Sequence, residues 1–115
     1  MTELACVLYS LGIVPTVTLH DADDALPLAA ALAAGGLPVA EVTFRTTAAA
    51  ESIRKICAGA PGMPVGAGTV TSLALARDAF EAGAPLTVTP DFSPMLVGWC
   101  SEQDLPAYQG CTMLR

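Results

Sequence analysis

A unit of strand, helix and glycine recurs along this sequence, and that repeat most constrains how the chain can fold. Predicted strands begin at Ile13, Val39, Val65 and Leu86, at intervals of 26, 26 and 21 residues. Each of them is followed by a segment with helical periodicity. Repeated strand–helix units of this length predict a parallel sheet covered by helices. Two architectures are built this way, the (β/α)8 barrel and the open doubly wound sheet.

The bounds of the expected elements follow from apolar periodicity, capping residues and glycines. Residues 2–11 are expected to form a lead-in helix, which ends at Gly12. Strands are expected over residues 13–19, 39–46, 64–69 and 85–89, with a partial fifth strand over 105–112. Helices are expected over residues 21–35, 46–59 and 72–82, and a short helix begins after Ser93. We therefore expect one domain, residues 1–115.

The composition disfavours several classes of protein. Hydrophobic residues make up 53% of the chain and the net charge is −6, which disfavours a disordered chain and a nucleic-acid or anionic-membrane partner. No apolar run reaches the roughly 18 residues of a membrane-spanning helix. The first ten residues contain Glu3 and no basic residue, unlike a signal peptide, so we expect a cytoplasmic protein. The four cysteines form no CxxC pair, and we expect reduced thiols and no metal site.

The second predicted strand, residues 39–46, carries two charged side chains within an apolar run. Strand alternation divides it into two faces, with Val39, Glu41, Thr43 and Arg45 on one and Ala40, Val42 and Phe44 on the other. Burying a charge without a partner costs several kcal/mol. The face with Glu41 and Arg45 must therefore lie against water, a ligand or a polar lumen. We take it as a candidate site; the alternative is an edge strand with a solvated face.

Polar residues lie at the carboxyl ends of the predicted strands, namely His20, Arg45, Thr69 and Thr89. Ligands bind at this end of the sheet in both architectures. A dinucleotide site is disfavoured, because the turn after the first strand has no glycine and residues 66–68 lack the third glycine of the fingerprint. Thr69 offers a hydroxyl and a backbone N–H, and with Arg45 it could hold a carboxylate. The alternative for Thr69 is a helix cap.

Several motifs, in a fixed order, resemble one known family. They are Gly-Ile-Val-Pro in the first strand, Ala-Gly-Gly before the second, then Glu-Val-Thr-Phe-Arg-Thr, Val-Gly-Ala-Gly-Thr-Val and Glu-Ala-Gly-Ala, and Thr-Pro after the fourth strand, between residues 12 and about 97. The sequence resembles 2-keto-3-deoxy-6-phosphogluconate (KDPG) aldolase, also described as 4-hydroxy-2-oxoglutarate aldolase. The resemblance implies a (β/α)8 barrel, usually a trimer, and a class I aldolase that releases pyruvate and glyceraldehyde 3-phosphate. We expect no cofactor.

The resemblance also implies roles for particular residues. In this chemistry a lysine amine forms a Schiff base with the ketone of the keto-deoxy sugar phosphate. Glu41 matches the general acid/base of the family. Arg45 and Thr69 match the residues that hold the pyruvyl carboxylate. Pro90 matches the residue that closes the pocket after the fourth strand.

The Schiff-base lysine of the family lies on the sixth strand, and its phosphate-binding loops follow the seventh and eighth. This sequence provides four complete strand–helix units, and its single lysine, Lys55, falls in a helix on the expected outer face. We therefore expect a half barrel that is truncated and inactive alone. Asp91 stands where the family usually has glycine, so a positive φ there would be strained. Residues 101–115 resemble the family only in part.

Two other interpretations remain open. The first is a non-catalytic half barrel that assembles with itself or with a separately encoded second half, because open sheet edges and apolar lumen residues such as Val17 and Val88 would otherwise be exposed. The second is a keto-acid-binding module that keeps Arg45 and Thr69 without the chemistry.

Overall fold

A computed structural model describes residues 2–110 as one parallel sheet with flanking helices. The helices are α1 (Glu3–Leu11), the 3-10 turn η1 (Ala22–Asp24), α2 (Ala25–Ala34), α3 (Ala49–Gly59), α4 (Leu73–Glu81) and α5 (Pro94–Glu102). The strands are β1 (Thr16–Val17), β2 (Ala40–Thr43), β3 (Val65–Gly68), β4 (Thr87–Thr89) and β5 (Ala107–Gln109). The predicted repeat of strand and helix is confirmed.

The order of the strands decides between the two architectures left open by the repeat. It is β1-β2-β3-β4-β5, and every neighbouring pair is parallel. A doubly wound sheet reverses its strand order partway, whereas a barrel adds each strand beside the previous one. The sheet therefore has the order of a barrel wall, with β1 and β5 as its edges.

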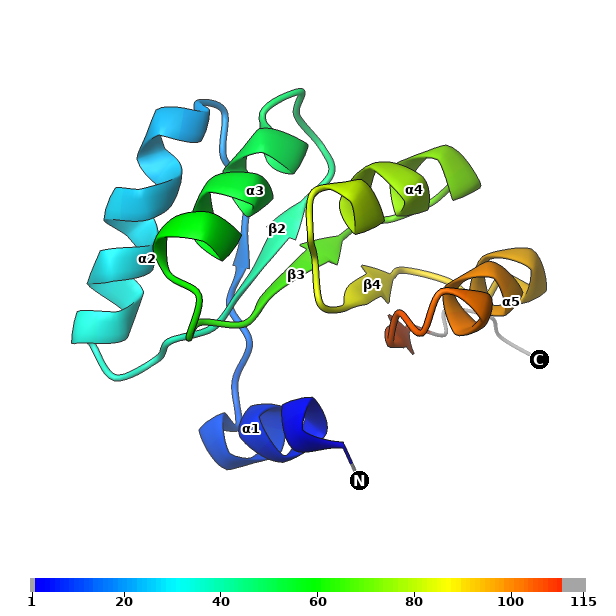
Figure 1. The fold of residues 1–115 in the computed structure, drawn as a ribbon, viewed down its shortest axis with the longest axis horizontal. Helices are drawn as coiled ribbons and strands as arrows, with labels where there is room; N and C mark the ends of the chain where they lie inside the picture. Colours follow the sequence, from blue (N-terminus) through cyan, green and yellow to red (C-terminus); the bar gives the residue numbers. More distant parts are fainter. Residues whose placement is uncertain (1, 111–115) are drawn as a thin grey trace.

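One face of the sheet is covered by helices. Figure 1 shows α2, α3, α4 and α5 along one side of the strands, whereas α1 lies apart, at the end where the strands begin. A single cluster of buried side chains joins this helical layer to the sheet; its largest members include Val42, Ile53, Ile56 and Val65, each 0% exposed. Many of its other members are alanines, which let the helices lie close to the strands.

We call the opposite surface of the sheet the inner face, and define it by Thr16, Glu41, Gly68, Leu86 and Val88. The pairing register places Thr16 of β1 beside Glu41 of β2. Gly66 and Gly68 of β3 lie on the same side, and so does Leu86, the residue before β4. No helix of the α2–α5 layer covers this face (Figure 1).

Predicted capping residues start and end several helices. Asp21 accepts a hydrogen bond from the Asp23 N–H at 2.9 Å, although the helix begins there as the 3-10 turn η1 and becomes α-helical only at Ala25. Ser93 caps α5 through the Leu96 N–H at 3.4 Å. Gly12 ends α1 in the left-handed conformation, with φ of 77°, which costs glycine no steric penalty.

Three sequence expectations about the strands need correction. Val17 packs against the helix-covered core and not into the lumen, because the register puts Thr16 on the inner face. The second strand ends at Thr43, so Arg45 lies in the following turn. The first strand shrinks to two residues. The fifth expected strand is observed as Ala107–Gln109, and its residues 111 and 112 lie outside the described part of the chain.

Within residues 2–110, no helix is both long and apolar enough to cross a membrane. The longest, α3, has 11 residues.

Candidate active site

The Glu41 carboxylate lies on the inner face, half-buried, between β1 and β3. Its Oε2 accepts a hydrogen bond from the Thr16 hydroxyl at 3.2 Å. On the other side lies Gly68, where an added Cβ would lie 2.7 Å from both Cγ and Cδ of Glu41. The missing side chain of Gly68 is therefore what makes room for the carboxylate. The expectation that Glu41 faces a lumen with polar groups agrees with this arrangement.

A second polar pair lies one step further along the same strands. The hydroxyls of Thr18 and Thr43 are 2.8 Å apart, and Thr43 is only 2% exposed. On the other face of β2, Ala40 and Val42 are buried in the core, and Phe44 packs against it. The predicted division of this strand into a polar and an apolar face is confirmed for residues 40–44.

A pocket of about 420 Å³ opens on the inner face beside Glu41. Its other walls are almost entirely apolar, and they come from α1, from strands β2, β4 and β5, and from the residues just before β1, β2 and β4: Ala5, Leu8, Tyr9, Val14, Val39, Ala40, Leu86, Val88 and Tyr108. Helix α1 thus closes one end of the inner face. The only carboxylate in this pocket is that of Glu41.

Arg45 does not share this pocket. It is exposed in the turn after β2 and lines a groove of about 370 Å³ together with residues of α3 and α4, among them Ala50, Leu75 and Asp78. Strand alternation stops at Thr43, which is why it mispredicted the direction of Arg45. The turn itself is anchored, because the hydroxyl of Thr46 donates a hydrogen bond to the carbonyl of Leu19, two residues after β1.

Thr69 directly follows β3 and has a positive φ of 56°. This conformation is uncommon for a β-branched residue, and such strained residues cluster at functional sites. Both neighbours are held: the Gly68 carbonyl accepts from the Phe44 N–H at 2.8 Å, and the Val70 N–H donates to the Val88 carbonyl at 3.3 Å. The alternative that Thr69 caps a helix is wrong, since Ser72 caps α4.

Pro90 follows β4 at the surface and lines a pocket of about 440 Å³ with Val70 and Phe92. The position of Asp91 does not require a positive φ, because Asp91 is not among the non-glycine residues with positive φ in residues 2–110. Asp91 instead makes a local turn, in which its side chain accepts from the Phe92 N–H at 2.9 Å and its carbonyl accepts from the Thr89 hydroxyl at 3.0 Å.

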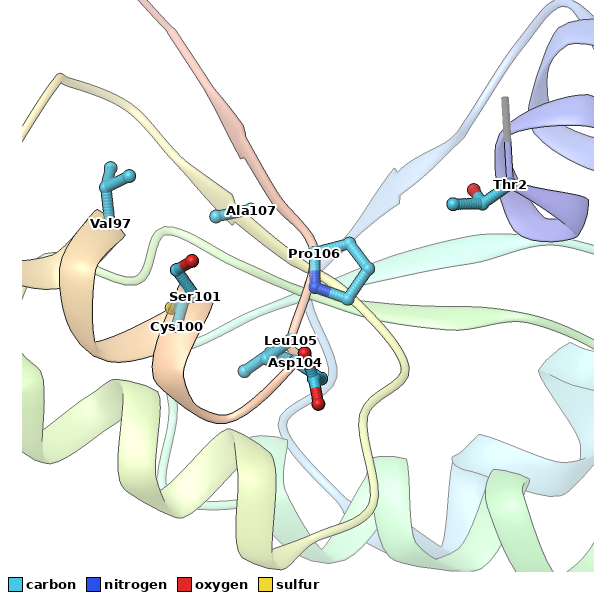
Figure 2. Close-up of a pocket in the computed structure, with 8 residues that line it drawn as sticks. All are labelled: Thr2, Val97, Cys100, Ser101, Asp104, Leu105, Pro106 and Ala107. Carbon is cyan, nitrogen blue, oxygen red and sulfur yellow. The ribbon is translucent and has the colours of Figure 1, made fainter.

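The four predicted site residues therefore lie after or within successive strands without sharing one pocket. Glu41, Arg45 and Pro90 line three different pockets, and Thr69 lines none of these three. A larger pocket of about 490 Å³ lies elsewhere, along α5 and the start of β5, and contains none of the four (Figure 2).

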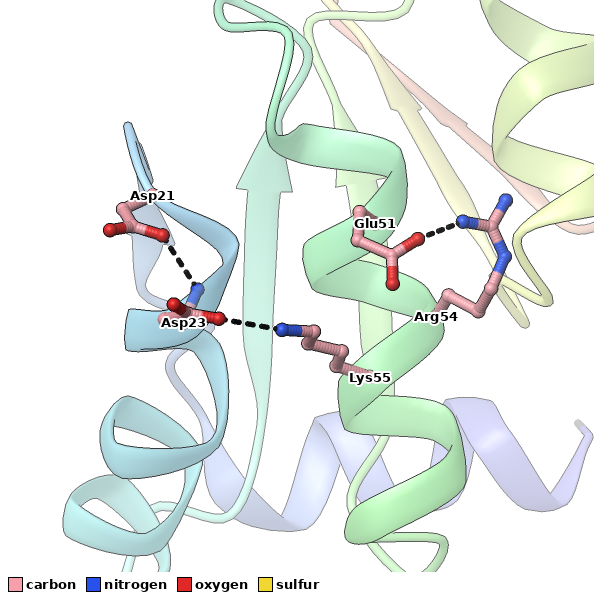
Figure 3. Close-up of polar contacts among 5 residues, drawn as sticks. All are labelled: Asp21, Asp23, Glu51, Arg54 and Lys55. Atoms are coloured by element: carbon pink, nitrogen blue, oxygen red, sulfur yellow. Dashed lines mark hydrogen bonds and ion pairs between the residues drawn. The ribbon is translucent and has the colours of Figure 1, made fainter.

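Lys55, the only lysine of the sequence, lies on α3 in the helical layer. Its Nζ donates a hydrogen bond to the Asp23 carboxylate at 2.9 Å, and Figure 3 shows it reaching from α3 toward η1. This bond raises the pKa of Lys55 and lowers the pKa of Asp23. A raised pKa keeps the amine protonated and not nucleophilic. The expectation that Lys55 lies on the outer helical layer is confirmed.

Sequence reasoning missed Thr16 as a partner of Glu41. The signal was the alternation of Thr16 and Thr18 around Val17, which marks one polar face, but the register between strands 25 residues apart is not visible in the sequence. Within residues 2–110, no group of three or more His, Cys, Asp or Glu side chains is placed to hold a metal ion. Burial raises the pKa of the Cys57 thiol, which disfavours its reactive thiolate.

Comparison with known proteins places this geometry in a family. The sequence profile of the aldolase family described as "KDPG and KHG aldolase" matches residues 5–113. The 2-dehydro-3-deoxy-phosphogluconate aldolase of Haemophilus influenzae is 44% identical over 103 residues, which cover 90% of this chain and 49% of that protein. The chain spans about half the length of the curated relatives it matches.

Two solved structures have the same fold. The aldolase of Zymomonas mobilis ZM4 with 3-phosphoglycerate gives a TM-score of 0.87 at 36% identity, covering 97% of this chain and 53% of that one. The Legionella pneumophila enzyme, with pyruvate captured at low pH as a covalent carbinolamine intermediate, gives 0.82 at 33% identity, covering 87% and 48%. The predicted half of a (β/α)8 barrel is confirmed, because the five parallel strands match about half of each structure.

Proposed function

This chain belongs to the KDPG and KHG aldolase family, and from that premise we propose that it forms one half of a class I aldolase site for KDPG or a related keto acid. The observation that carries the proposal is the Glu41 carboxylate, which lies on the inner face beside a hydroxyl donor and an apolar pocket. A carboxylate in such a place can both give and take a proton.

The chemistry of the Legionella relative suggests what Glu41 would do. That protein holds pyruvate as a carbinolamine, the adduct formed when an amine adds to a carbonyl. Forming this adduct requires a proton to move from the attacking nitrogen to the carbonyl oxygen, and dehydrating it requires a second proton on the resulting hydroxyl, which then leaves as water. We assign these transfers to Glu41, and the binding of the pyruvyl carboxylate to Arg45 and Thr69. Pro90 would border the pocket at the end of β4.

In this proposal the amine comes from outside these 115 residues. Lys55 is bound to Asp23 in the helical layer, and the sequence has no second lysine. The 115-residue chain alone is therefore expected to lack Schiff-base activity.

Reductive trapping tests this expectation. The purified chain is incubated with pyruvate and borohydride, and its intact mass is compared with that of a relative of full length treated in the same way. We expect an adduct on the relative and none on this chain. A pyruvate adduct mapped to Lys55 would contradict both the proposed source of the amine and the placement of Lys55.

Assembly of half barrels is a second candidate function, and the open inner face favours it. Tyr108 and Val14 in its pocket are 40% and 36% exposed, and the edges of β1 and β5 carry no partner strand within residues 2–110. A second half barrel, or another copy of this chain, would cover them. Sedimentation at working concentration tests this: a monomer over the whole concentration range would contradict self-assembly.

The proposal extends to a homotrimer, as the resemblance implies, and to the cytoplasmic location expected from the sequence.

A further inference from the structure

We infer that Thr16 is a positioning residue for Glu41: its hydroxyl holds Oε2, so that Oε1 is the oxygen left free for proton transfer. The inference rests on the proposed role of Glu41 as general acid/base. It concerns a residue on a different strand, which the sequence analysis did not connect with the site.

The backbone fixes the approach of Thr16 to Glu41. The Glu41 N–H donates to the Pro15 carbonyl at 2.9 Å, and this ladder bond sets Thr16 opposite Glu41 in the parallel pair. Thr16 is β-branched, so its χ1 is restricted and its hydroxyl has few directions available. The hydroxyl reaches Oε2 at 3.2 Å. The strand register and the restricted χ1 of Thr16 therefore both favour this contact.

Thr16 is the hydrogen-bond partner of Oε2 within residues 2–110. Among the described residues that line the pocket beside Glu41, none of the others is charged, and the hydroxyl of Thr18 is engaged by Thr43 at 2.8 Å. Within residues 2–110, Thr16 is the only side chain that donates a hydrogen bond to Glu41, and Oε1 has no bonded partner. The two oxygens of the carboxylate are thus inequivalent.

Gly68 restrains the same carboxylate by contact. A Cβ at this position would come within 2.7 Å of Cγ and Cδ of Glu41, so the side chain rests directly on the β3 backbone. The hydroxyl on one side and the glycine on the other leave the stem of Glu41 little freedom. Orientation of this kind lowers the cost of reaching the reactive geometry.

The test compares three variants of the 115-residue chain without ligand. Thr16→Val removes the hydroxyl and keeps the shape, Thr16→Ser keeps the hydroxyl, and Thr18→Val removes the neighbouring hydroxyl as a matched control. NMR couplings report the rotamers of Glu41. We expect one dominant rotamer in the wild type, in Thr16→Ser and in Thr18→Val, and its loss to averaging in Thr16→Val. An unchanged rotamer in Thr16→Val, or averaging in Thr16→Ser, would overturn the inference.

A second pair of variants keeps the inference testable if Thr16→Val fails to fold. Gly68→Ala is expected to displace Glu41 from its rotamer. Gly66→Ala, on the same face of the same strand, meets Leu86 instead, whose Cγ would lie 3.0 Å from the new Cβ. Its Glu41 signals should stay as in the wild type. Equal disturbance of Glu41 by both glycine variants would count against a specific restraint.

A pyruvate titration separates this inference from the proposed function. Loss of the dominant rotamer in Thr16→Val supports the positioning role whether or not pyruvate shifts the signals of the wild type. A wild type that does not respond to pyruvate at all would weaken the assignment of Arg45 and Thr69 alone. A normal response to pyruvate together with an unchanged rotamer in Thr16→Val would overturn the positioning role alone.

Discussion

The two faces of the sheet differ in how completely the described residues bury them. On the helix-covered face, Val42 and Ile53 are fully buried in a core contributed by four helices. On the inner face, Val88 and Glu41 are half-buried, and Tyr108 is 40% exposed beside a pocket of about 420 Å³. The same five strands thus carry a buried core on one side and a partly exposed surface on the other.

The two faces differ because they are covered by different elements of the fold. A strand–helix unit brings its own cover to the outer side of the sheet, so each added unit completes its part of that core. The inner face of a barrel is filled by side chains from strands on the opposite wall. Glu41, the proposed acid/base residue, lies on the side that local units cannot complete, whereas Arg45 lines a groove beside α3 and α4. The proposed acid/base residue and the helix-covered core therefore lie on opposite faces of the sheet.

Truncating one valine on each face should give the largest contrast. Val42→Ala on the helix-covered face is expected to lower the free energy of unfolding by about 2 kcal/mol, the transfer energy of a buried valine plus a cavity term. Val88→Ala on the inner face should cost about half of that or less, because Val88 is only half-buried. Urea denaturation of both variants measures the difference.

An equal loss in the two variants would break the comparison. It would mean that the inner face is covered in solution, and sedimentation at the same concentration would then be expected to find an assembly.

Removing either of two buried hydroxyls should change the free energy of unfolding by a smaller amount, and the two changes should have opposite signs. The Ser52 hydroxyl on α3 is fully buried and is the buried polar side-chain atom without a hydrogen-bond partner in residues 2–110. Ser52→Ala is therefore expected to stabilise the chain by about 1 kcal/mol. Thr43→Val on the inner face removes the bond to Thr18 and should destabilise it by about 1 kcal/mol. Thermal unfolding at neutral pH reads both signs.

Destabilisation by Ser52→Ala would show that its hydroxyl finds a partner in solution, such as a carbonyl in the preceding turn of α3. The double variant serves as the control, since its two effects should add at these separate sites.

The ion pair between Lys55 and Asp23 should give the smallest effect, because both groups are solvent-exposed. The pKa of Asp23 is lowered in the folded chain, so its contribution is present above the usual value of 3.8 and is lost as pH falls through the folded value. The pKa of Lys55 is raised, so its contribution is present below 10.5 and is lost as pH rises through the folded value.

Removing the amine tests this pH window. Lys55→Met should therefore lower the Tm slightly and by a constant amount between pH 3.8 and pH 10.5. Its Tm should match that of the wild type once the pH is below the folded pKa of Asp23 or above the folded pKa of Lys55. Arg54→Met, which loses the neighbouring bond to Glu51 on the same helix, is the control (Figure 3). A difference from the wild type that persisted at pH 2 would indicate lost packing by the lysine stem and not a lost charge pair.

The sequence predicted the parts of the fold that depend on local pattern. The repeat of strands and helices, the cap at Ser93 and the left-handed Gly12 each follow from residues close together in the chain. The faces of β2 were also predictable, because Ala40 and Val42 alternate with Glu41 and Thr43 over a strand that really is extended.

The rest depends on where strands stop and how they align. Arg45 was assigned to the face of Glu41 because the strand was expected to continue to residue 46. The strand instead ends at Thr43, so alternation does not determine the direction of Arg45. Val17 was placed in the lumen because an apolar residue fits either side of a parallel sheet. Only the register of Thr16 with Glu41 settles the side, and a register is a property of two distant segments.

The sequential strand order also has a consequence for how the chain is made. Each strand pairs with one that lies 20 to 25 residues before it, as in Thr16 with Glu41, Ala40 with Val65 and Thr87 with Ala107. At synthesis rates of about 5–20 residues per second, a new strand leaves the ribosome every few seconds. Its partner has by then already been made, so the sheet can grow during translation, one strand at a time.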